Sequence, residues 1–376
     1  MSEKGASWGA WSVAFVWFTT HFGGGFASGR QIVEFFAQFG WYAVFTPIIS
    51  VAIISAVLYF AWSFAVKHKT YDYLTWSSGY FKPLGKALTF FFEIVIEVMY
   101  IIILLLATGI ALATGGTLVS EILPNVSYSA CTVALAVLIF VLTIWGAETV
   151  RRAAASMAIL IIAGMLVIYL TSLYNNFPKL AAAVSAMPSP ADKGGFGEAL
   201  WQSVKYAGLQ CAVVGAYIAV ADALKTQDDV KKTTLVGFVL NAGMLMLAMT
   251  GVFAFYPEIN AERMPIIYVT LHGGGGEPVL LVVSLIILLA VVSTGVGMVY
   301  GGARRVSNWW KKKTGTGESR AVDVIAPAVY ILVAWCLSTF GLIGLIAQGY
   351  GWVGILSTPL VVIPILLMGF VHRRHS

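Results

Sequence analysis

Hydrophobic residues run along this chain in long stretches that are separated by short polar segments. Ten stretches are long enough to cross a bilayer, since a helical crossing takes about 20 apolar residues. They cover residues 9–38, 41–66, 86–113, 129–147, 153–174, 198–222, 233–256, 278–303, 323–346 and 350–371. The pattern predicts an all-α polytopic membrane protein with ten transmembrane helices, forming a single transmembrane domain over residues 1–376.

The positions of lysine and arginine set the orientation of these spans. With the amino terminus inside, 18 of the 23 basic residues fall in cytoplasmic segments, whereas only Lys179, Lys193 and Arg263 fall in outer loops. Positive charge is enriched on the cytoplasmic side of membrane proteins. We therefore expect a multi-pass protein of the cell membrane with both termini in the cytoplasm and no cleavable signal.

Composition narrows the classes of function. The chain is 59% hydrophobic and 11% charged, against about 25% charged in soluble domains. Its basic residues form no cluster on a soluble face, so no nucleic-acid partner is expected. It has no HExxH motif, no paired cysteines at metal-like spacing and no nucleotide-binding motif. We expect neither an enzyme nor a bound cofactor, and the sequence leaves the oligomeric state open.

The first span is interrupted by glycine. Gly23, Gly24 and Gly25 follow each other in the middle of an apolar stretch, with Gly29 a turn later. A helix in hydrocarbon satisfies its own backbone, and non-helical backbone at that depth occurs where it lines a cavity. Close packing of small residues is the alternative. The run predicts a broken helix at the bilayer midplane.

Ten spans divide into five plus five, and an odd number in each half means that the second half enters from the opposite side. This predicts inverted repeats over about 9–174 and 198–371. Span 6 then corresponds to span 1, and the segment Trp201–Gln210 gives it a weaker polar interruption. The ends of broken helices offer amides to an anion and carbonyls to a cation, which suits a zwitterion such as an amino acid. The substrate-binding candidates at the two breaks are Gly23, Gly24, Gly25, Phe26, Ala207, Gly208 and Gln210.

A few ionisable side chains lie inside the spans, where they are costly and tend to be functional. Glu97 and Tyr100 share one face of span 3 near its centre and are further substrate-binding candidates. Glu97 is also a candidate for carrying a proton, or for pairing with Lys205 or Arg30. The candidates for gating or proton coupling are His21, Arg30, Glu34, Glu93 and Lys205.

Two connections contain further structure. The inner loop 67–86 alternates aromatic and polar residues, which predicts a short amphipathic helix at the membrane interface. The outer segment 260–272 is too short to span a bilayer and is predicted to form a hairpin that caps an outer vestibule.

These features together resemble the LeuT-type fold of the amino acid–polyamine–organocation superfamily of secondary transporters. The opening Phe-Gly-Gly-Gly-Phe-Ala-Ser-Gly-Arg-Gln of residues 22–31 is similar to that of YkvI-type amino-acid permeases. The resemblance implies that Arg30 belongs to an outer gate. Relatives place the acidic partner of this arginine in span 10, which here has no acid, so Glu34 or Glu97 is expected to replace it.

The resemblance also implies a sodium site. In sodium-coupled relatives, two adjacent hydroxyls of span 8 join carbonyls of span 1 around the ion. The matching residues here are Phe22, Gly25, Ser293 and Thr294. Serine and threonine pairs also bond carbonyls one turn back in ordinary membrane helices, which is the competing interpretation.

The function expected from the sequence is ion-coupled secondary transport of small amino acids or related amines by alternating access. Sodium is the favoured coupling ion, and a proton is the alternative. A channel or a membrane-embedded enzyme is a remote alternative. The expected partners are a small-molecule substrate and the lipid bilayer.

Overall fold

A computed structural model describes residues 3–23, 26–145, 147–190, 193–314 and 320–374, and the described residues contain helices and no strands. The first half comprises α1 (Glu3–His21), η1 (Phe26–Ser28), α2 (Arg30–Phe35), η2 (Ala37–Val44), α3 (Thr46–His68), α4 (Tyr73–Phe81), η3 (Lys82–Leu84), α5 (Lys86–Ile122), α6 (Tyr128–Trp145) and α7 (Ala147–Ser185). The second half comprises α8 (Gly195–Cys211), α9 (Val214–Ala219), η5 (Ala221–Ala223), α10 (Gln227–Phe253), η6 (Glu258–Ala261), α11 (Pro265–His272), α12 (Gly276–Thr314), α13 (Arg320–Ser338), α14 (Gly341–Gly344), η7 (Leu345–Tyr350), α15 (Gly351–Ser357), η8 (Thr358–Val362) and α16 (Ile363–Arg374).

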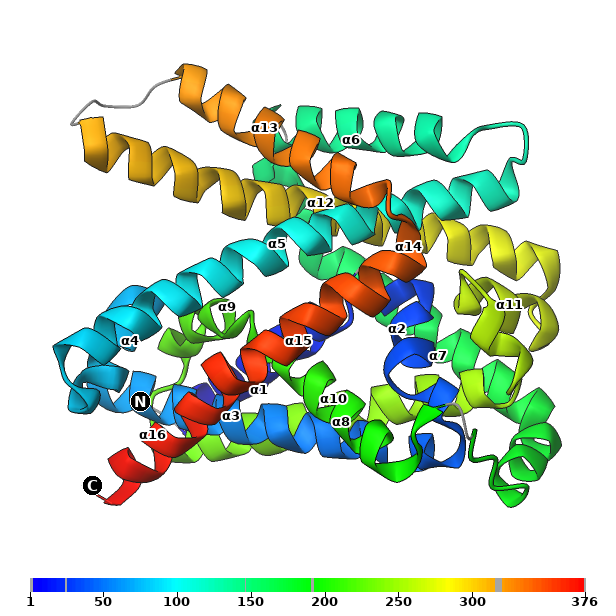
Figure 1. Cartoon of the computed structure of the whole chain (residues 1–376), viewed down its shortest axis with the longest axis horizontal. Coiled ribbons are helices and arrows are strands. Elements are labelled where there is room, and N and C mark those ends of the chain that lie inside the picture. The colour runs from blue at the N-terminus through cyan, green and yellow to red at the C-terminus, as the bar shows by residue number, and fades with distance from the viewer. Residues whose placement is uncertain (1–2, 24–25, 146, 191–192, 315–319, 375–376) are drawn as a thin grey trace.

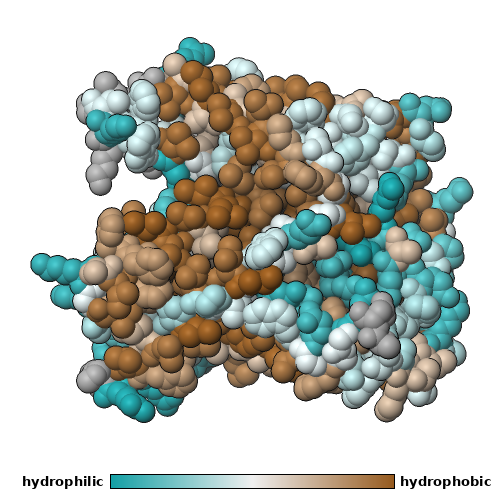
Figure 2. All heavy atoms as spheres, in the orientation of Figure 1, coloured by the Kyte–Doolittle hydropathy of each residue, from teal (hydrophilic) through white to brown (hydrophobic). Residues whose placement is uncertain are grey.

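Most of these helices are long and apolar enough to cross a membrane. Within the described residues eight helices meet that test, and the bent pair formed by α8 and the segment Val214–Ala223 makes a ninth. Figure 2 shows hydrophobic residues across much of one face, between hydrophilic residues at the right of the view and at the tips on the left. An all-helical, multi-pass membrane protein is therefore confirmed.

The long helices pack in two groups. The helices α5, α6, α12 and α13 pack against one another and run along the upper part of Figure 1. A second group in the lower part consists of α1, α3, α8 and α10. The helix α7 joins the groups by packing on both α10 and α12, and α15 does so by packing on α8 and α5.

Glycine and alanine let the first group pack closely. A side chain at Gly115 would meet Leu135 of α6 and Val291 of α12, and one at Gly109 would come within 3.1 Å of a carbonyl of α13. Small residues are the usual means by which membrane helices approach each other. The middle of α5 is accordingly buried without a break from Ala107 to Leu118.

Several predicted boundaries are wrong. The spans 86–113 and 153–174 are parts of the longer helices α5 and α7, because α5 continues to Ile122 and α7 to Ser185. The span 323–346 ends instead at Ser338, since Gly341 adopts a left-handed conformation with φ of 76° and starts the next helix. That last span begins at residue 341 and contains two π-helical stretches, η7 and η8.

The outer end of the first span also differs from the prediction. Its helix α2 ends at Phe35, and residues 37–44 form the 3₁₀ segment η2 rather than the end of one span and the start of the next. Gly40 lies within η2 with φ of 69°, at a point where an added side chain would collide with the carbonyl of Pro188. Only glycine fits this close approach of two backbones.

The helix predicted in the inner loop is present, and the segment 260–272, predicted as a hairpin, forms the end of η6 and the helix α11. In the inner loop α4 begins at an Asp72 cap that accepts a hydrogen bond from the Thr75 amide, and it buries Trp76, Tyr80 and Phe81. In the outer segment Pro265 begins α11, which packs on α2, α7, α10 and α12. The two connections cover opposite ends of the helix groups (Figure 1).

Candidate functional site

The first span is interrupted where its glycines predict. The helix α1 ends at His21, and helical structure resumes at Phe26, whose amide and that of Ala27 donate to the Gly23 carbonyl. The predicted ligands Gly24 and Gly25 lie outside the described residues. Phe22 is fully buried, and its ring packs on His21 and Phe26 at centroid distances of 4.5 and 4.6 Å.

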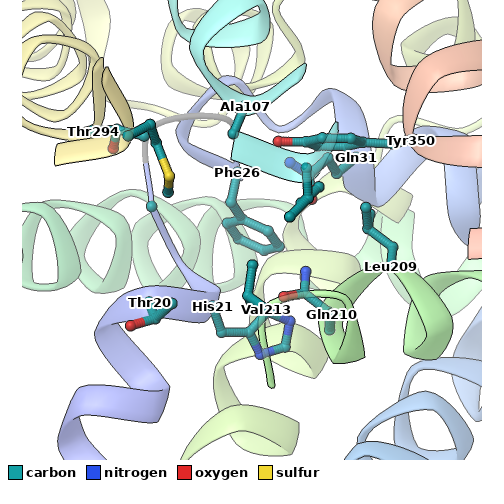
Figure 3. A pocket seen from close by; sticks show the side chains of 13 residues that line it. Thr20, His21, Phe26, Gln31, Ala107, Leu209, Gln210, Val213, Thr294 and Tyr350 are labelled. Carbon is teal, nitrogen blue, oxygen red and sulfur yellow. The ribbon is translucent and has the colours of Figure 1, made fainter. Parts of the chain in front are cut away.

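The second interruption lies in span 6. The helix α8 ends at Cys211 and α9 begins at Val214, with a bend of 48° between the two parts of the span. Both breaks border one small cavity of about 70 Å³. Figure 3 shows Phe26 projecting between Gln31 and Tyr350 on one side and His21 and Gln210 on the other. The residues that line the cavity are Thr20, His21, Gly23, Phe26, Gln31, Ile103, Ala107, Leu209, Gln210, Val213, Thr294, Met298 and Tyr350.

The cavity is lined by apolar side chains together with a few polar ones, and it carries no carboxylate, lysine or arginine among the residues that the structure describes. Gln31 is 4% exposed, and its Oε1 has no hydrogen-bond partner within the described part of the chain. A buried acceptor without a partner costs about 1–3 kcal/mol. Gln31 is therefore ready to accept a hydrogen bond from a ligand in the cavity.

His21 is held in a buried network that joins three helices. Its Nδ1 lies 2.7 Å from Oδ1 of Asn241 on α10, and its Nε2 lies 2.7 Å from the Tyr206 hydroxyl on α8. Asn241 donates its own amide to the Gly237 carbonyl, which leaves Oδ1 as an acceptor. His21 Nδ1 is then the donor and Nε2 accepts from Tyr206, an arrangement that fits a neutral ring. A buried cation without a charged partner is costly, which agrees with a neutral ring. The two hydrogen bonds of His21 connect the end of α1 to α8 and α10.

Thr294 on α12 faces the break in the first span. An added Cβ at Gly23 would lie 3.6 Å from the Thr294 hydroxyl and 3.6 Å from the Thr20 carbonyl, so oxygen atoms from α12 and α1 flank this glycine. The neighbouring Ser293 donates to the Ala290 carbonyl at 3.4 Å, the bond one turn back that the competing interpretation expects. Thr294 lines the cavity, whereas Ser293 does not.

Arg30 ties the outer part of the first span to the segment before α11. Its guanidinium donates to the carbonyls of Asn260 and Glu262 at 2.8 and 2.9 Å and forms an ion pair with Glu34 at 3.1 Å. Arg30 is buried, with 5% of its surface exposed. Of the two expected partners, Glu34 is therefore the one that Arg30 contacts.

Glu97 lies in a different cluster. Its carboxylate pairs with Arg305 of α12 at 2.6 Å and accepts a hydrogen bond from the Tyr73 hydroxyl of α4. The expected pairing with Lys205 or Arg30 is wrong. The Arg305 guanidinium also stacks on the rings of Tyr73 and Tyr100, at 4.6 and 4.3 Å. Neither Glu97 nor Tyr100 lines the cavity.

The remaining predicted residues have local partners. Glu93 accepts a hydrogen bond from Ser78 of α4, and Lys205 lies 3.9 Å from Glu198. Ala207 is buried, outside the cavity lining. A side chain at Gly208 would lie 2.5 Å from the Gly354 carbonyl of α15, so this glycine permits two helices to touch.

The structure thus brings together Gly23, Phe26, Gln210, His21 and Thr294 from the sequence candidates. The sequence did not indicate Thr20, Gln31, Tyr350 or Asn241 as members of the site, and it did not indicate Arg305 as the partner of Glu97. A polar residue in the last turn before a predicted break was an available signal for Thr20. No local signal was available for the others, since they join the site through tertiary packing.

The fold is similar to that of a solved Na⁺-coupled sialic acid symporter in a substrate-bound, outward-open state with a novel Na⁺ site. The similarity covers 95% of this chain and 86% of the symporter, with a TM-score of 0.52 and 12% sequence identity. No protein-family model and no curated protein matches the sequence. The chain therefore has the fold of a membrane symporter, as the LeuT-type resemblance predicted.

Proposed function

We propose that this protein is an ion-coupled secondary transporter of small amino acids or related amines that works by alternating access. The observation that carries the proposal is the small cavity where two broken spans meet, between an Arg30 contact network and a Glu97–Arg305 cluster. Broken helices with a shared site between them are typical of secondary transporters. The structural likeness to a symporter supports the same class.

The two contact networks lie on different sides of this cavity along the helices. Glu97 precedes the lining residue Ile103 by six positions on α5, which is ~9 Å of helix, and Arg305 follows the lining residue Met298 by seven positions on α12, or ~10 Å. Arg30 instead adjoins the lining residue Gln31 and reaches toward η6. We propose that Arg30 belongs to an outer gate and that Glu97, Arg305 and Tyr73 form an inner one.

The arrangement of helices supports ten spans as two inverted repeats, about 9–174 and 198–371, in the cell membrane with both termini cytoplasmic. In such a repeat α5 and α6 correspond to α12 and α13, and these four helices pack together. Likewise α1 and α3 correspond to α8 and α10, which form the other group. Each group thus contains matching members of both halves, so motion between the groups would expose the cavity to each side in turn.

The chemistry of the cavity supports a small substrate with an ammonium group. The helices α1 and α8 both end beside it, and a helix carboxyl end carries partial negative charge. The unpartnered Oε1 of Gln31 adds an acceptor. At about 70 Å³ the cavity suits a ligand the size of the smallest amino acids, and a larger one requires Phe26 or Tyr350 to move.

Sodium is the favoured coupling ion. The Thr20 carbonyl and the Thr294 hydroxyl lie around Gly23, and oxygen atoms are the ligands that hard cations take. Phe22, Gly25 and Ser293 complete the proposed site. A proton is the alternative, with His21, Glu93, Glu97 or Lys205 as carriers. The satisfied neutral ring of His21 favours a structural role for that residue.

Uptake into liposomes containing the purified protein tests this function. Labelled glycine, alanine and betaine would each be offered with an inward sodium gradient, with a proton gradient, and with neither. Concentrative uptake that requires sodium supports the proposal, and uptake driven equally by protons without sodium reassigns the coupling ion. Flux that only equilibrates the substrate under every gradient indicates a channel and contradicts the proposal.

A further inference from the structure

A second cavity is larger than the one at the breaks. It measures about 760 Å³ and is bounded by the carboxyl ends of α3 and α16, by α4 and by the start of α10. Figure 1 shows α3, α4 and α16 together at the left, near the carboxyl terminus. None of its lining residues belongs to the cavity at the breaks.

One part of this second cavity is strongly basic. Five of its lining residues carry basic or imidazole side chains, and none of the described lining residues is acidic. These five are Lys67, His68, Lys225, His372 and Arg373. Such a set of side chains attracts an anion.

The two acidic residues in the first turn of α10 are engaged elsewhere. Asp229 forms a capping box with Thr226 at the start of α10, and it also accepts the Lys225 amide. Asp228 pairs with Lys231 at 2.8 Å. The Lys225 ammonium donates to the carbonyl of Asp222, a neutral partner. The first turn of α10 therefore does not neutralise the basic wall.

The other part of the cavity is apolar and continues onto an exposed helix face. Tyr59 and Phe60 line it two turns before the end of α3, and the Phe60 ring packs on Phe370 of α16 at 5.0 Å. Phe370 and Leu367 are 55% and 61% exposed. The surface thus changes from apolar to basic along the direction of the helices.

We propose that this groove binds an anionic phospholipid, with its phosphate at the basic end and its acyl chains along Phe60 and Phe370. Basic pockets between membrane helices on the cytoplasmic side are suited to anionic headgroups, and the positive-inside pattern places this end in the cytoplasm. A free phosphate compound shares the headgroup chemistry but makes no use of the apolar end. The continuity of the two parts is what selects a lipid. The proposal does not depend on transport.

Native mass spectrometry of the purified full chain with defined lipids tests the proposal. Phosphatidylglycerol and phosphatidylcholine with identical acyl chains would be titrated against the wild type, K67Q/R373Q and K231Q/K232Q. Both pairs of residues are exposed and at the same end of the molecule, but only the first pair lines the groove. Since a basic residue near a charged lipid contributes about 1 kcal/mol, the K67Q/R373Q variant is expected to bind phosphatidylglycerol about 30-fold more weakly.

The expected pattern is preference for phosphatidylglycerol over phosphatidylcholine in the wild type and in K231Q/K232Q, with loss of that preference in K67Q/R373Q. Equal binding of the two lipids to the wild type would overturn the proposal, because the groove would then be merely apolar. An equal loss in both variants would assign the effect to overall surface charge. Displacement of the lipid by glycerol phosphate at equal concentration would show a site for soluble phosphate and overturn the lipid assignment.

Discussion

Gln31 shows how the proposed site works at the scale of single residues. Its amide is buried beside the broken end of α1, and its Oε1 has no partner among the described residues. Such an acceptor costs stability when the cavity is empty of donors, and it regains that energy when a ligand donates to it. Selectivity for a substrate with N–H groups follows from this arrangement.

Replacing Gln31 with leucine is therefore expected to weaken substrate binding. A hydrogen bond to a charged group contributes about 1.5–3 kcal/mol, which corresponds to a loss in affinity of about 10- to 100-fold. Equilibrium binding of labelled substrate to the purified protein measures this. The control is Gln348→Leu, which removes an exposed amide outside the cavity. Equal affinity of Gln31→Leu and the wild type would show that the amide does not contact the substrate.

The proposed sodium site gives a second prediction at this scale. Changing Ser293 to alanine and Thr294 to valine removes two hydroxyl ligands with little change in volume. A ligand that binds only the folded state raises its stability in proportion to the logarithm of ligand concentration. The double variant is thus expected to lose the rise in melting temperature that sodium gives the wild type. Ser284→Ala, which removes a hydroxyl of α12 outside the cavity, should keep it. A full sodium response in the double variant would contradict the site.

Individual residues were also where sequence reasoning was least complete. The glycine run located the break because its composition is unusual in any helix, so no tertiary information was needed. Glu97, in contrast, pairs with Arg305, which is 208 positions away. The depth of each residue within its predicted span could not distinguish Arg305 from Lys205 as the partner of Glu97. Gln31 lines the cavity two positions after Gly29, which turns the chain with φ of 76° before α2 begins.

At the scale of elements, the contact between α8 and α15 determines the shape of the second broken span. Gly208 faces the Gly354 carbonyl, and a side chain at Gly354 would in turn collide with the Lys205 carbonyl. Two glycines on facing helices let the backbones touch, as in small-residue packing motifs generally. This contact fixes α8 immediately before the break at Cys211, so it positions Gln210 in the cavity.

Gly208→Ala is expected to destabilise the protein even without substrate. The new methyl group would lie 2.5 Å from a backbone oxygen that cannot move independently, and overpacking of this kind costs about 1–3 kcal/mol. Gly243→Ala in α10 is the matched control, because nothing lies within 4 Å of its added methyl group and alanine favours a helix by about 1 kcal/mol. Thermal denaturation of the two variants should therefore shift in opposite directions. If Gly208 instead served only to bind substrate, Gly208→Ala would leave the stability of the unliganded protein unchanged.

The helices themselves were predictable because a membrane span requires a long apolar run, whatever its neighbours. Their ends were less predictable. The helix α5 continues to Ile122 after the apolar run was expected to stop, and the turn at Gly341 depends on a local backbone conformation. The packing of helices into two groups was implied only by the inverted-repeat hypothesis.

At the scale of the whole molecule, Tyr73 links the broken span 6 to the scaffold of α5 and α12. The Cβ of Tyr73 packs against Gly215 of α9, since a methyl group added at Gly215 would lie 3.3 Å from it. Its hydroxyl donates to Glu97 and accepts from Arg305. Glu97 and Arg305 belong to one helix group, so the tyrosine, rather than the ion pair alone, connects this group to α9. In the proposed inner gate, opening would break this link.

Tyr73→Phe removes the link while leaving the ion pair and the ring under Arg305 in place. Loss of hydrogen bonds to charged groups, about 1.5–3 kcal/mol, is expected to shift the closed-to-open equilibrium of the inner gate by at least about tenfold. The readout is the rate at which an impermeant maleimide, added from the cytoplasmic side, labels Cys211. This cysteine is buried at the end of α8, and Cys131 and Cys336 would be changed to alanine.

Faster labelling with unchanged substrate affinity supports the gate, because Tyr73 does not line the cavity. Glu93→Gln, which alters only the neighbouring bond to Ser78, should label at the wild-type rate. If Tyr73→Phe also labels at the wild-type rate, the cluster is a static brace and the inner gate lies elsewhere.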